Sequence, residues 1–207
     1  MKIIKEKQPK AFFLENVRHL EKHNDGKTFE TIRKILTEDL GYSFEHKIVK
    51  ASDFGLPTHR PRLYMIGFRK DINPEGFSFP ESIPLTMTMS DVLGGKCPKK
   101  IGFTLRVGGS GSGIHDRRNW DSYLVDGKAR RITVEEGKMM MGFPENFVFP
   151  VSKAQALKQL GNSVAVSAIQ VVGSGITNTL SYRVSYSRAE RTFNRDSTMR
   201  LQTPVAA

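Results

Sequence analysis

The stretch from Phe12 to Val17 constrains the fold most strongly, because an apolar run there ends abruptly in an acid and an amide. We expect residues 10–14 to form a short buried strand, preceded by a basic helical stub. A strand that ends in this way places Glu15 and Asn16 at the carboxyl edge of a sheet, where open α/β sheets bind ligands. A partly desolvated carboxylate at such an edge can hold a proton or bind the edge of a base. Taken alone, however, this stretch favours the plainer interpretation of a buried strand followed by a polar turn.

Further patterns along the chain indicate an α/β domain. Apolar residues at spacings of three and four predict an amphipathic helix that ends at Gly41 and packs on a sheet. Runs of strand character and two later helices follow. The elements expected after the first strand are a helix with apolar positions Phe29, Ile32, Leu36 and Leu40, a strand at 42–50, a turn at 53–57, a strand at 63–68, a helix at 134–141 closed by Gly142, and a helix broken at 159–163 that resumes to about residue 176.

Composition narrows the kind of partner. The 207 residues include 32 lysines and arginines but 21 acids, a formal net charge of +11, and this surplus favours a polyanion such as nucleic acid over an inert basic surface. The hydrophobic fraction of 38% allows one domain with its own core, with or without a smaller lobe. The single cysteine, Cys97, rules out an internal disulfide. With no apolar run of about 18 residues and no signal peptide, the sequence predicts a reducing, cytoplasmic setting.

Residues 70–128 differ in character, because glycine and proline are frequent and regular periodicity is lost. This predicts a separate lobe or a long elaborated loop. Within it, residues 104–123 combine glycines, which allow close backbone approach to another surface, with arginine, tryptophan and tyrosine side chains. A flexible Gly-Ser linker is the alternative, but linkers rarely carry so many large side chains, so we favour nucleic-acid contact. The donors available to phosphates and base edges are Arg106, Arg117, Arg118 and Asn119.

Four sequence blocks occur in the order that one enzyme family shows. They are Glu15-Asn16-Val17, Thr58-His59-Arg60-Pro61-Arg62, Arg130-Arg131-Ile132-Thr133-Val134-Glu135-Glu136 leading to Met141-Gly142-Phe143-Pro144, and Gln159-Leu160-Gly161-Asn162-Ser163-Val164. With these blocks, and with a Gly- and Arg-rich stretch between the second and third, roughly residues 1–176 resemble the DNA cytosine-5 methyltransferases of bacterial restriction-modification systems. No single block is decisive, but all four in order are very specific.

The resemblance implies a fold and its division into parts. The fold class is α/β: the C-terminal part of a Rossmann-like, S-adenosylmethionine-dependent methyltransferase sheet, with a small, mostly irregular or β target-recognition lobe. Residues 1–70 would form the C-terminal half of the catalytic domain, and residues 71–128 the recognition lobe. Residues 129–180 would complete that lobe and return to the catalytic domain as a helix. Residues 181–207 show little periodicity and are expected to be a poorly ordered tail.

The resemblance also assigns roles. In the family, the target cytosine flips out of duplex DNA, a cysteine thiolate attacks C6, and C5 takes the methyl group of S-adenosyl-L-methionine. Glu15 matches the glutamate that binds the N3 and amino edge of the cytosine. Arg60 and Arg62 match arginines that contact the flipped nucleotide or line the active site. Asn162 and Ser163 match the block that helps to form the cofactor pocket.

The remaining matches concern DNA. Arg130 and Glu136 belong to the third block, which organises the lobe that reads DNA sequence, and we interpret both as mainly structural. No metal site is expected. The residues expected at the duplex are Arg106, Arg117, Arg118, Asn119 and Arg130.

Departures from the family pattern are as informative as the matches. Thr58 stands where the family has glutamine, and Pro61 separates the two arginines. No Phe-x-Gly-x-Gly cofactor loop and no Pro-Cys nucleophile pair occur in the sequence. Cys97 cannot replace that nucleophile, because it precedes Pro98 and lies in the variable lobe. The helper carboxylate is therefore present without the nucleophile that it helps.

Three interpretations remain open at this point. The chain is the C-terminal subunit of a two-chain methyltransferase, whose second subunit brings the cofactor loop and the cysteine. Alternatively, it is an inactive, truncated remnant. The third possibility, from a different class, is a sequence-specific DNA-binding module without chemistry. We favour the incomplete methyltransferase, and we expect no methyl transfer by this chain alone.

Overall fold

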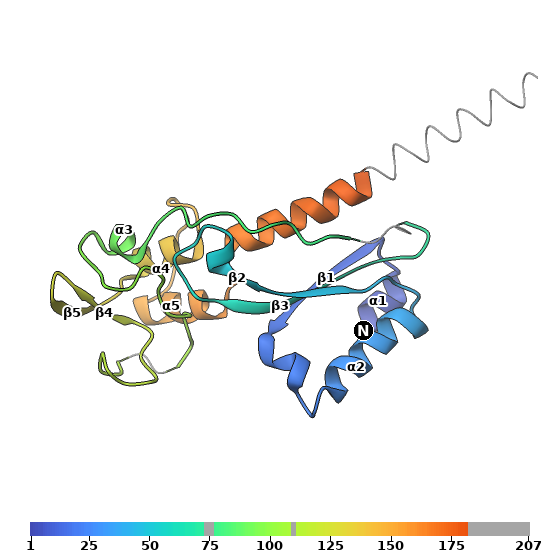
Figure 1. Cartoon of the computed structure of the whole chain (residues 1–207), viewed down its shortest axis with the longest axis horizontal. Coiled ribbons are helices and arrows are strands. Elements are labelled where there is room, and N and C mark those ends of the chain that lie inside the picture. The colour runs from blue at the N-terminus through green and yellow to red at the C-terminus, as the bar shows by residue number, and fades with distance from the viewer. Residues whose placement is uncertain (73–76, 109–110, 182–207) are drawn as a thin grey trace, which may run out of the picture.

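An antiparallel three-stranded sheet forms the centre of the larger part of the molecule. The computed structural model describes residues 1–72, 77–108 and 111–181 (Figure 1). The strand order is β1 (Ala11–Val17), β3 (Pro61–Phe68), β2 (Glu45–Lys50), and β3 runs antiparallel to both neighbours. Strands β1 and β2 are therefore parallel to each other, and the helix between them, α2 (Lys27–Lys34), makes the crossover typical of α/β folds. The predicted α/β class is confirmed.

The other elements follow in chain order, and most agree with expectation. Helix α4 has the predicted bounds. The last helix is broken, but at residues 163–165 and not at the predicted 159–163, since residues 159–162 are still helical. The remaining elements are α1 (Lys2–Lys7), η1 (Arg18–Lys22), η2 (Ile35–Asp39), η3 (Ala51–Asp53), α3 (Met89–Leu93), β4 (Ser122–Val125), β5 (Lys128–Arg131), α4 (Val134–Met141), α5 (Lys153–Asn162) and a helix over residues 166–181.

Two strand boundaries were predicted wrongly. Strand β1 does not stop at Leu14 but continues to Val17, so Glu15 and Asn16 lie inside the strand. Strand β2 begins at Glu45 and not at Tyr42, because Tyr42 makes only an isolated bridge. The Tyr42 side chain is buried, and its hydroxyl donates a hydrogen bond to the carbonyl of Pro9 at 2.6 Å. The predicted tail, residues 181–207, lies outside the described residues except for Ser181.

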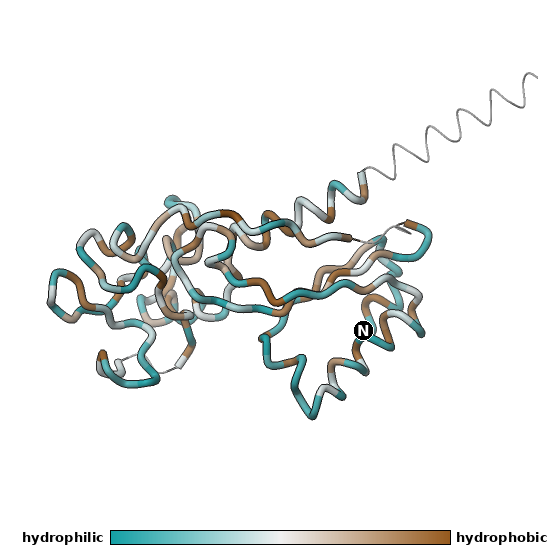
Figure 2. Tube along the Cα trace, viewed as in Figure 1, coloured by the Kyte–Doolittle hydropathy of each residue, from teal (hydrophilic) through white to brown (hydrophobic). Residues whose placement is uncertain are grey.

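Helices cover both faces of the sheet (Figure 1). On one face, Tyr64, Ile66 and Phe68 of β3 pack against Ala168 and Val172 of helix 166–181. On the other face, helices α1 and α2 with η2 enclose a smaller core. Figure 2 shows that hydrophobic residues are frequent along β1 and β3, whereas η1 and the turn after it are hydrophilic. This layering leaves β1 and β2 as the two edge strands within the described part of the chain.

A second core holds the smaller lobe together. It is built around Trp120, Tyr123, Met140 and Leu160, which are at most 2% exposed. The tryptophan Nε1 donates to the carbonyl of Gly108 at 3.0 Å, so the largest side chain also anchors the glycine-rich stretch. Strands β4 and β5 pair antiparallel, which agrees with the expected mostly irregular or β lobe.

The stretch Lys153–Ser181 is long and apolar enough, by length and composition alone, to cross a membrane. In the structure it is two helices separated at residues 163–165. The apolar side chains of the second helix that are buried, Ala168, Val172 and Ile176, pack on the sheet. We therefore interpret it as a core helix of the sheet.

Gly67 of β3 tests the packing between the sheet and its surroundings. A Cβ at this position would lie 2.2 Å from the carbonyl oxygen of Ser43 and 2.4 Å from the Phe12 ring. We expect Gly67→Ala to lower the free energy of unfolding by about 3 kcal/mol, because the core cannot accommodate the methyl group. Gly173→Ala is the control, since it meets nothing within 4 Å and lies in a helix. Urea unfolding measures both, and equal midpoints would contradict the packing.

Candidate active site

A carboxylate and a guanidinium meet where β1 ends and β3 begins. Glu15 is paired in register with Tyr64, and Val17 with Arg62, so the Glu15 and Arg62 side chains project from the same face of the sheet. The Nε of Arg62 lies 2.8 Å from Oε1 of Glu15, and the two groups form an ion pair. The two side chains are 30% and 17% exposed, respectively, so the pair is only partly desolvated. The structure thus brings together two residues that are 47 positions apart in the sequence.

The geometry leaves the Glu15 carboxylate able to bind a ligand. One oxygen is ion-paired with Arg62, and within the described residues no other partner contacts the carboxylate. Asn16 is occupied locally, since its Oδ1 accepts the N–H of Val17 at 2.8 Å. Burial raises the pKa of Tyr64 to about 12, and the charge of Glu15 adds to this effect, so the tyrosine remains a neutral hydroxyl. The arrangement suits a ligand that presents N–H groups to an oriented carboxylate.

Arg60 does not line this site, and the prediction that it contacts substrate is wrong. It is 2% exposed, and its guanidinium donates to the carbonyls of Leu105 at 3.1 Å and Gly161 at 3.0 Å, and also to the carbonyl of Ser163. Burial lowers the pKa of Arg60 to about 10, and the neighbouring charge of Arg62 adds to this effect. The two arginines of one motif therefore have different roles. Arg62 lies in β3 and reaches Glu15, whereas Arg60 precedes β3, which begins at Pro61, and its guanidinium binds carbonyls of two distant segments.

The predicted cofactor residues, Asn162 and Ser163, lie at the end of α5. Ser163 is used internally: its hydroxyl donates to the carbonyl of Leu160 at 2.8 Å, and its own carbonyl accepts from Arg60. Asn162 is exposed, and its amide has no partner among the described residues. One free amide at a helix end fits the margin of a cofactor site.

The predicted DNA-contacting residues separate into two groups. Arg106 and Arg117 are exposed and unpaired within the part of the chain that the structure describes. Arg118 is exposed but paired with Asp116 at 2.8 Å, and its hydrogen bonds lower the pKa of that carboxyl to about 2. Asn119 is 4% exposed, and its amide bonds the backbone of Ile114 and Ser122. The prediction that Asn119 reads bases is therefore wrong, since it is a structural turn residue.

Arg130 is likewise not free for DNA. It forms two hydrogen bonds with Glu136, at 2.7 and 3.0 Å, and a third with the carbonyl of Leu93 at 2.6 Å. Glu136 in turn accepts the N–H of Thr133 at 2.7 Å in the capping box of α4. The prediction of DNA contact is corrected, whereas the interpretation of the third block as mainly structural agrees with these contacts.

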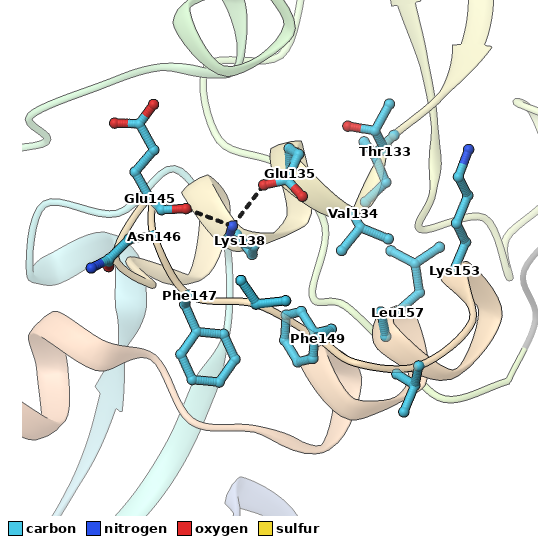
Figure 3. Close-up of a pocket in the computed structure, with 14 residues that line it drawn as sticks. Thr133, Val134, Glu135, Lys138, Glu145, Asn146, Phe147, Phe149, Lys153 and Leu157 are labelled. Carbon is cyan, nitrogen blue, oxygen red and sulfur yellow. Dashed lines mark hydrogen bonds and ion pairs between the residues drawn. The ribbon is translucent and has the colours of Figure 1, made fainter.

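A sizeable groove lies elsewhere in the described part of the chain. It has a volume of about 750 Å³ and runs between α4, residues 145–151 and α5 (Figure 3). Its walls are largely apolar, and the buried Nζ of Lys138 pairs with Glu135 at 2.7 Å and with the carbonyl of Glu145 at 2.9 Å. Neither Glu15 nor Arg62 nor Asn162 lines it. The sequence does not reveal this groove, because the apolar residues that line it have the same spacing as residues of a hydrophobic core.

The sheet with helices on both faces and the separate lobe define the class of the protein as an α/β fold. Solved structures with this fold include a DNA modification methyltransferase encoded within an E. coli prophage, with a TM-score of 0.65 and 20% identity over 86% of this chain and 72% of that one. The S. pombe Dnmt2 methyltransferase aligns with a TM-score of 0.59 and 19% identity over 80% and 65% of the two chains.

Sequence comparison identifies the family. Residues 1–106 and 102–178 match the C-5 cytosine-specific DNA methylases, and the chain belongs to this family. Curated relatives include the type II methyltransferases M.HpaII of Haemophilus parainfluenzae, 36% identical over 86% of this chain, and M.HhaI of Haemophilus parahaemolyticus, 30% identical over 88%. A third, M.SsoII of Shigella sonnei, is 36% identical over 86%. The chain spans 63%, 67% and 56% of the lengths of these three relatives, respectively.

The Arg130–Glu136 pair gives a pH-dependent prediction. Burial alone would raise the pKa of Glu136, but hydrogen bonds from Arg130 and from the N–H of Thr133 outweigh it and lower the pKa below the ordinary 4.5. Because the folded-state pKa is lowered, this stabilisation is present above pH 4.5 and is lost as the pH falls through the folded-state value. We expect Arg130→Met to cost about 1–2 kcal/mol at neutral pH and to flatten the loss of stability below pH 4.5.

Unfolding midpoints measured from neutral to acidic pH test this prediction. Lys128→Met is the matched control, because Lys128 is exposed on the same strand, β5, and should leave the slope unchanged. Parallel curves for wild type and Arg130→Met would show that the pair contributes no pH dependence.

Proposed function

We propose that the chain provides the target-base carboxylate and the DNA-recognition lobe of a cytosine-5 DNA methyltransferase that uses S-adenosyl-L-methionine. The observation that carries this proposal is the Glu15–Arg62 pair, with its 2.8 Å contact at the strand end and its carboxylate otherwise free among the described residues. Family membership supports the reaction class. The natural partner is duplex DNA, in keeping with the net charge of +11, and the expected setting is the cytoplasm of a cell with a restriction-modification system.

Glu15 would act on a cytosine that has left the base stack. An oriented carboxylate can accept the exocyclic N–H of the base and share a proton at N3, which neutralises negative charge that develops in the ring. Arg62 positions the carboxylate by binding one of its oxygens, so the other is directed to the base. Arg106 and Arg117, which are exposed, would contact the duplex through phosphates or base edges.

The cofactor would supply the methyl group. Within this chain, the side-chain amide of Asn162 is the group placed to contact it, since Ser163 is used by Leu160 and Arg60. The nucleophilic cysteine and the cofactor loop would come from outside these 207 residues, either from a partner subunit or from a longer form of the chain. Strand β1 supports this proposal, because in the described residues its outer edge is unpaired and could accept another strand.

Methyl-transfer assays with duplex DNA and S-adenosyl-L-methionine test the proposal. We expect no activity from the purified 207-residue chain, and activity once a segment that carries the Pro-Cys pair and the cofactor loop is added. In the reconstituted enzyme, Glu15→Gln should lower kcat about 100-fold or more, because a positioned acid is lost.

Glu6→Gln is the matched control, since Glu6 is exposed on α1 and should leave kcat unchanged. Activity from the chain alone would overturn the proposal that the cysteine and the cofactor loop come from outside these residues. Activity insensitive to Glu15→Gln would remove Glu15 from the mechanism.

A DNA-binding module without chemistry is the second candidate. The separate core of the lobe and the exposed Arg106 and Arg117 favour it. In that case, DNA affinity would fall steeply with salt and would survive Glu15→Gln, but no added segment would restore methyl transfer. An inactive remnant would show neither sequence-specific affinity nor reconstitution.

A further inference from the structure

Three segments that are distant in the sequence meet at the guanidinium of Arg60. The first is the entry to β3 at residues 57–60, the second is the start of the lobe at residues 102–106, and the third is the end of α5 at residues 161–163. Arg60 is 2% exposed and donates to a carbonyl of the second segment and to two carbonyls of the third. One side chain therefore links all three.

The first two segments are also joined by their own hydrogen bonds. The N–H of Gly102 donates to the carbonyl of Pro57, and the N–H of His59 donates to the carbonyl of Gly102, both at 2.9 Å. The buried hydroxyl of Thr58 donates to the carbonyl of Phe103 at 2.9 Å. The start of the lobe is thus fixed to the strand that carries Arg62.

The third segment approaches the lobe closely at a glycine. A Cβ on Gly161 would lie 2.6 Å from the carbonyl carbon of Arg106, so only glycine allows this packing. The carbonyls of Gly161 and Ser163 lie at a helix end, where backbone acceptors lack partners within the helix. A buried guanidinium satisfies them and is favoured there by its positive charge.

Each contact of Arg60 lies beside a residue of the proposed function. Arg62 of β3 follows Arg60 by two positions, Arg106 follows Leu105, and Asn162 lies between Gly161 and Ser163. We propose that Arg60 is a positioning residue that holds the base-binding pair, the DNA-contacting lobe and the cofactor margin in one relative geometry. This inference rests on the proposed function of the site. It assigns to the second sequence block a coupling role, in place of direct contact with the nucleotide.

The chemistry of the contacts requires arginine. A planar guanidinium can donate in several fixed directions at once, whereas a lysine amine is a compact group on a flexible stem. Arg60→Lys should therefore keep the charge and the fold but lose the common alignment. Displacement of reacting groups by about 1 Å can cost about 100-fold in rate, so we expect kcat/KM to fall on that scale.

The reconstituted methyltransferase provides the test. We expect Arg60→Lys to raise the KM for DNA and the KM for S-adenosyl-L-methionine by about 10-fold each, and to lower kcat. The reason is that both substrates depend on the joint, the set of contacts by which Arg60 holds the three segments together. Gly161→Ala, which separates α5 from the lobe by an independent route, should give the same pattern. Arg62→Lys should instead lower kcat with little change in the KM for the cofactor.

Leu36→Ala is the control for a merely structural role. Leu36 is fully buried in the core on the opposite face of the sheet, so this variant should lose stability but keep both KM values below its unfolding midpoint. If Arg60→Lys and Gly161→Ala behave like Leu36→Ala, Arg60 is only structural and the proposal is overturned.

Hydrogen exchange on the 207-residue chain separates this inference from the proposed function, because it needs no activity. Arg60→Lys should increase amide exchange at residues 102–106 and 161–164 and leave β1 protected. Unchanged exchange in both segments would contradict the joint even if methyl transfer is confirmed. Increased exchange with no activity in any reconstituted wild type would leave the joint standing and remove the methyltransferase proposal.

Discussion

The buried guanidinium of Arg60 is the interaction on which the relation between the two parts of the molecule depends. A charged group that is 2% exposed is costly unless its donors are satisfied. Three backbone carbonyls accept from the two terminal nitrogens of Arg60, whereas its Nε has no partner among the described residues. Those carbonyls come from the start of the lobe and the end of α5, so the charge can be buried only when both segments are in place. The core around Tyr64 and Val172 and the core around Trp120 and Leu160 are thereby joined at a polar point.

The Glu15–Arg62 pair differs from the contacts of Arg60 in two ways: it is more exposed, and its carboxylate has unoccupied hydrogen-bond acceptors. Its side chains are 30% and 17% exposed, and within the described residues the carboxylate has one arginine partner. A group intended only for stability would be expected to have all its acceptors occupied, as Glu136 does with Arg130 and Thr133. The open carboxylate at a strand end, in a chain of the C-5 cytosine-specific methylase family, is what favours base binding over a structural role.

Much of the fold was predictable from local patterns. The α4 helix has its predicted bounds because Thr133 and Glu136 form a capping box and Gly142 adopts a positive φ of 74°. A break in the last helix was predicted at residues 159–163, although the structure places it slightly later, at 163–165. The insertion of β3 between β1 and β2 was not predictable from residue spacing, since strand order depends on contacts between segments far apart in the chain.

The sequence by itself determined the residue types of the candidate site and their order, and with them the family, because motif chemistry is encoded by neighbouring residues. Only the tertiary structure decided which of those groups is free to act. Arg60 and Arg62 are two positions apart, yet one binds carbonyls from two distant segments and the other binds Glu15. Asn119 and Arg106 lie in the same basic stretch, yet one is buried and the other exposed. The physical reason is that a donor is used by whichever acceptor folding brings within hydrogen-bond distance, and that distance is not encoded in local spacing.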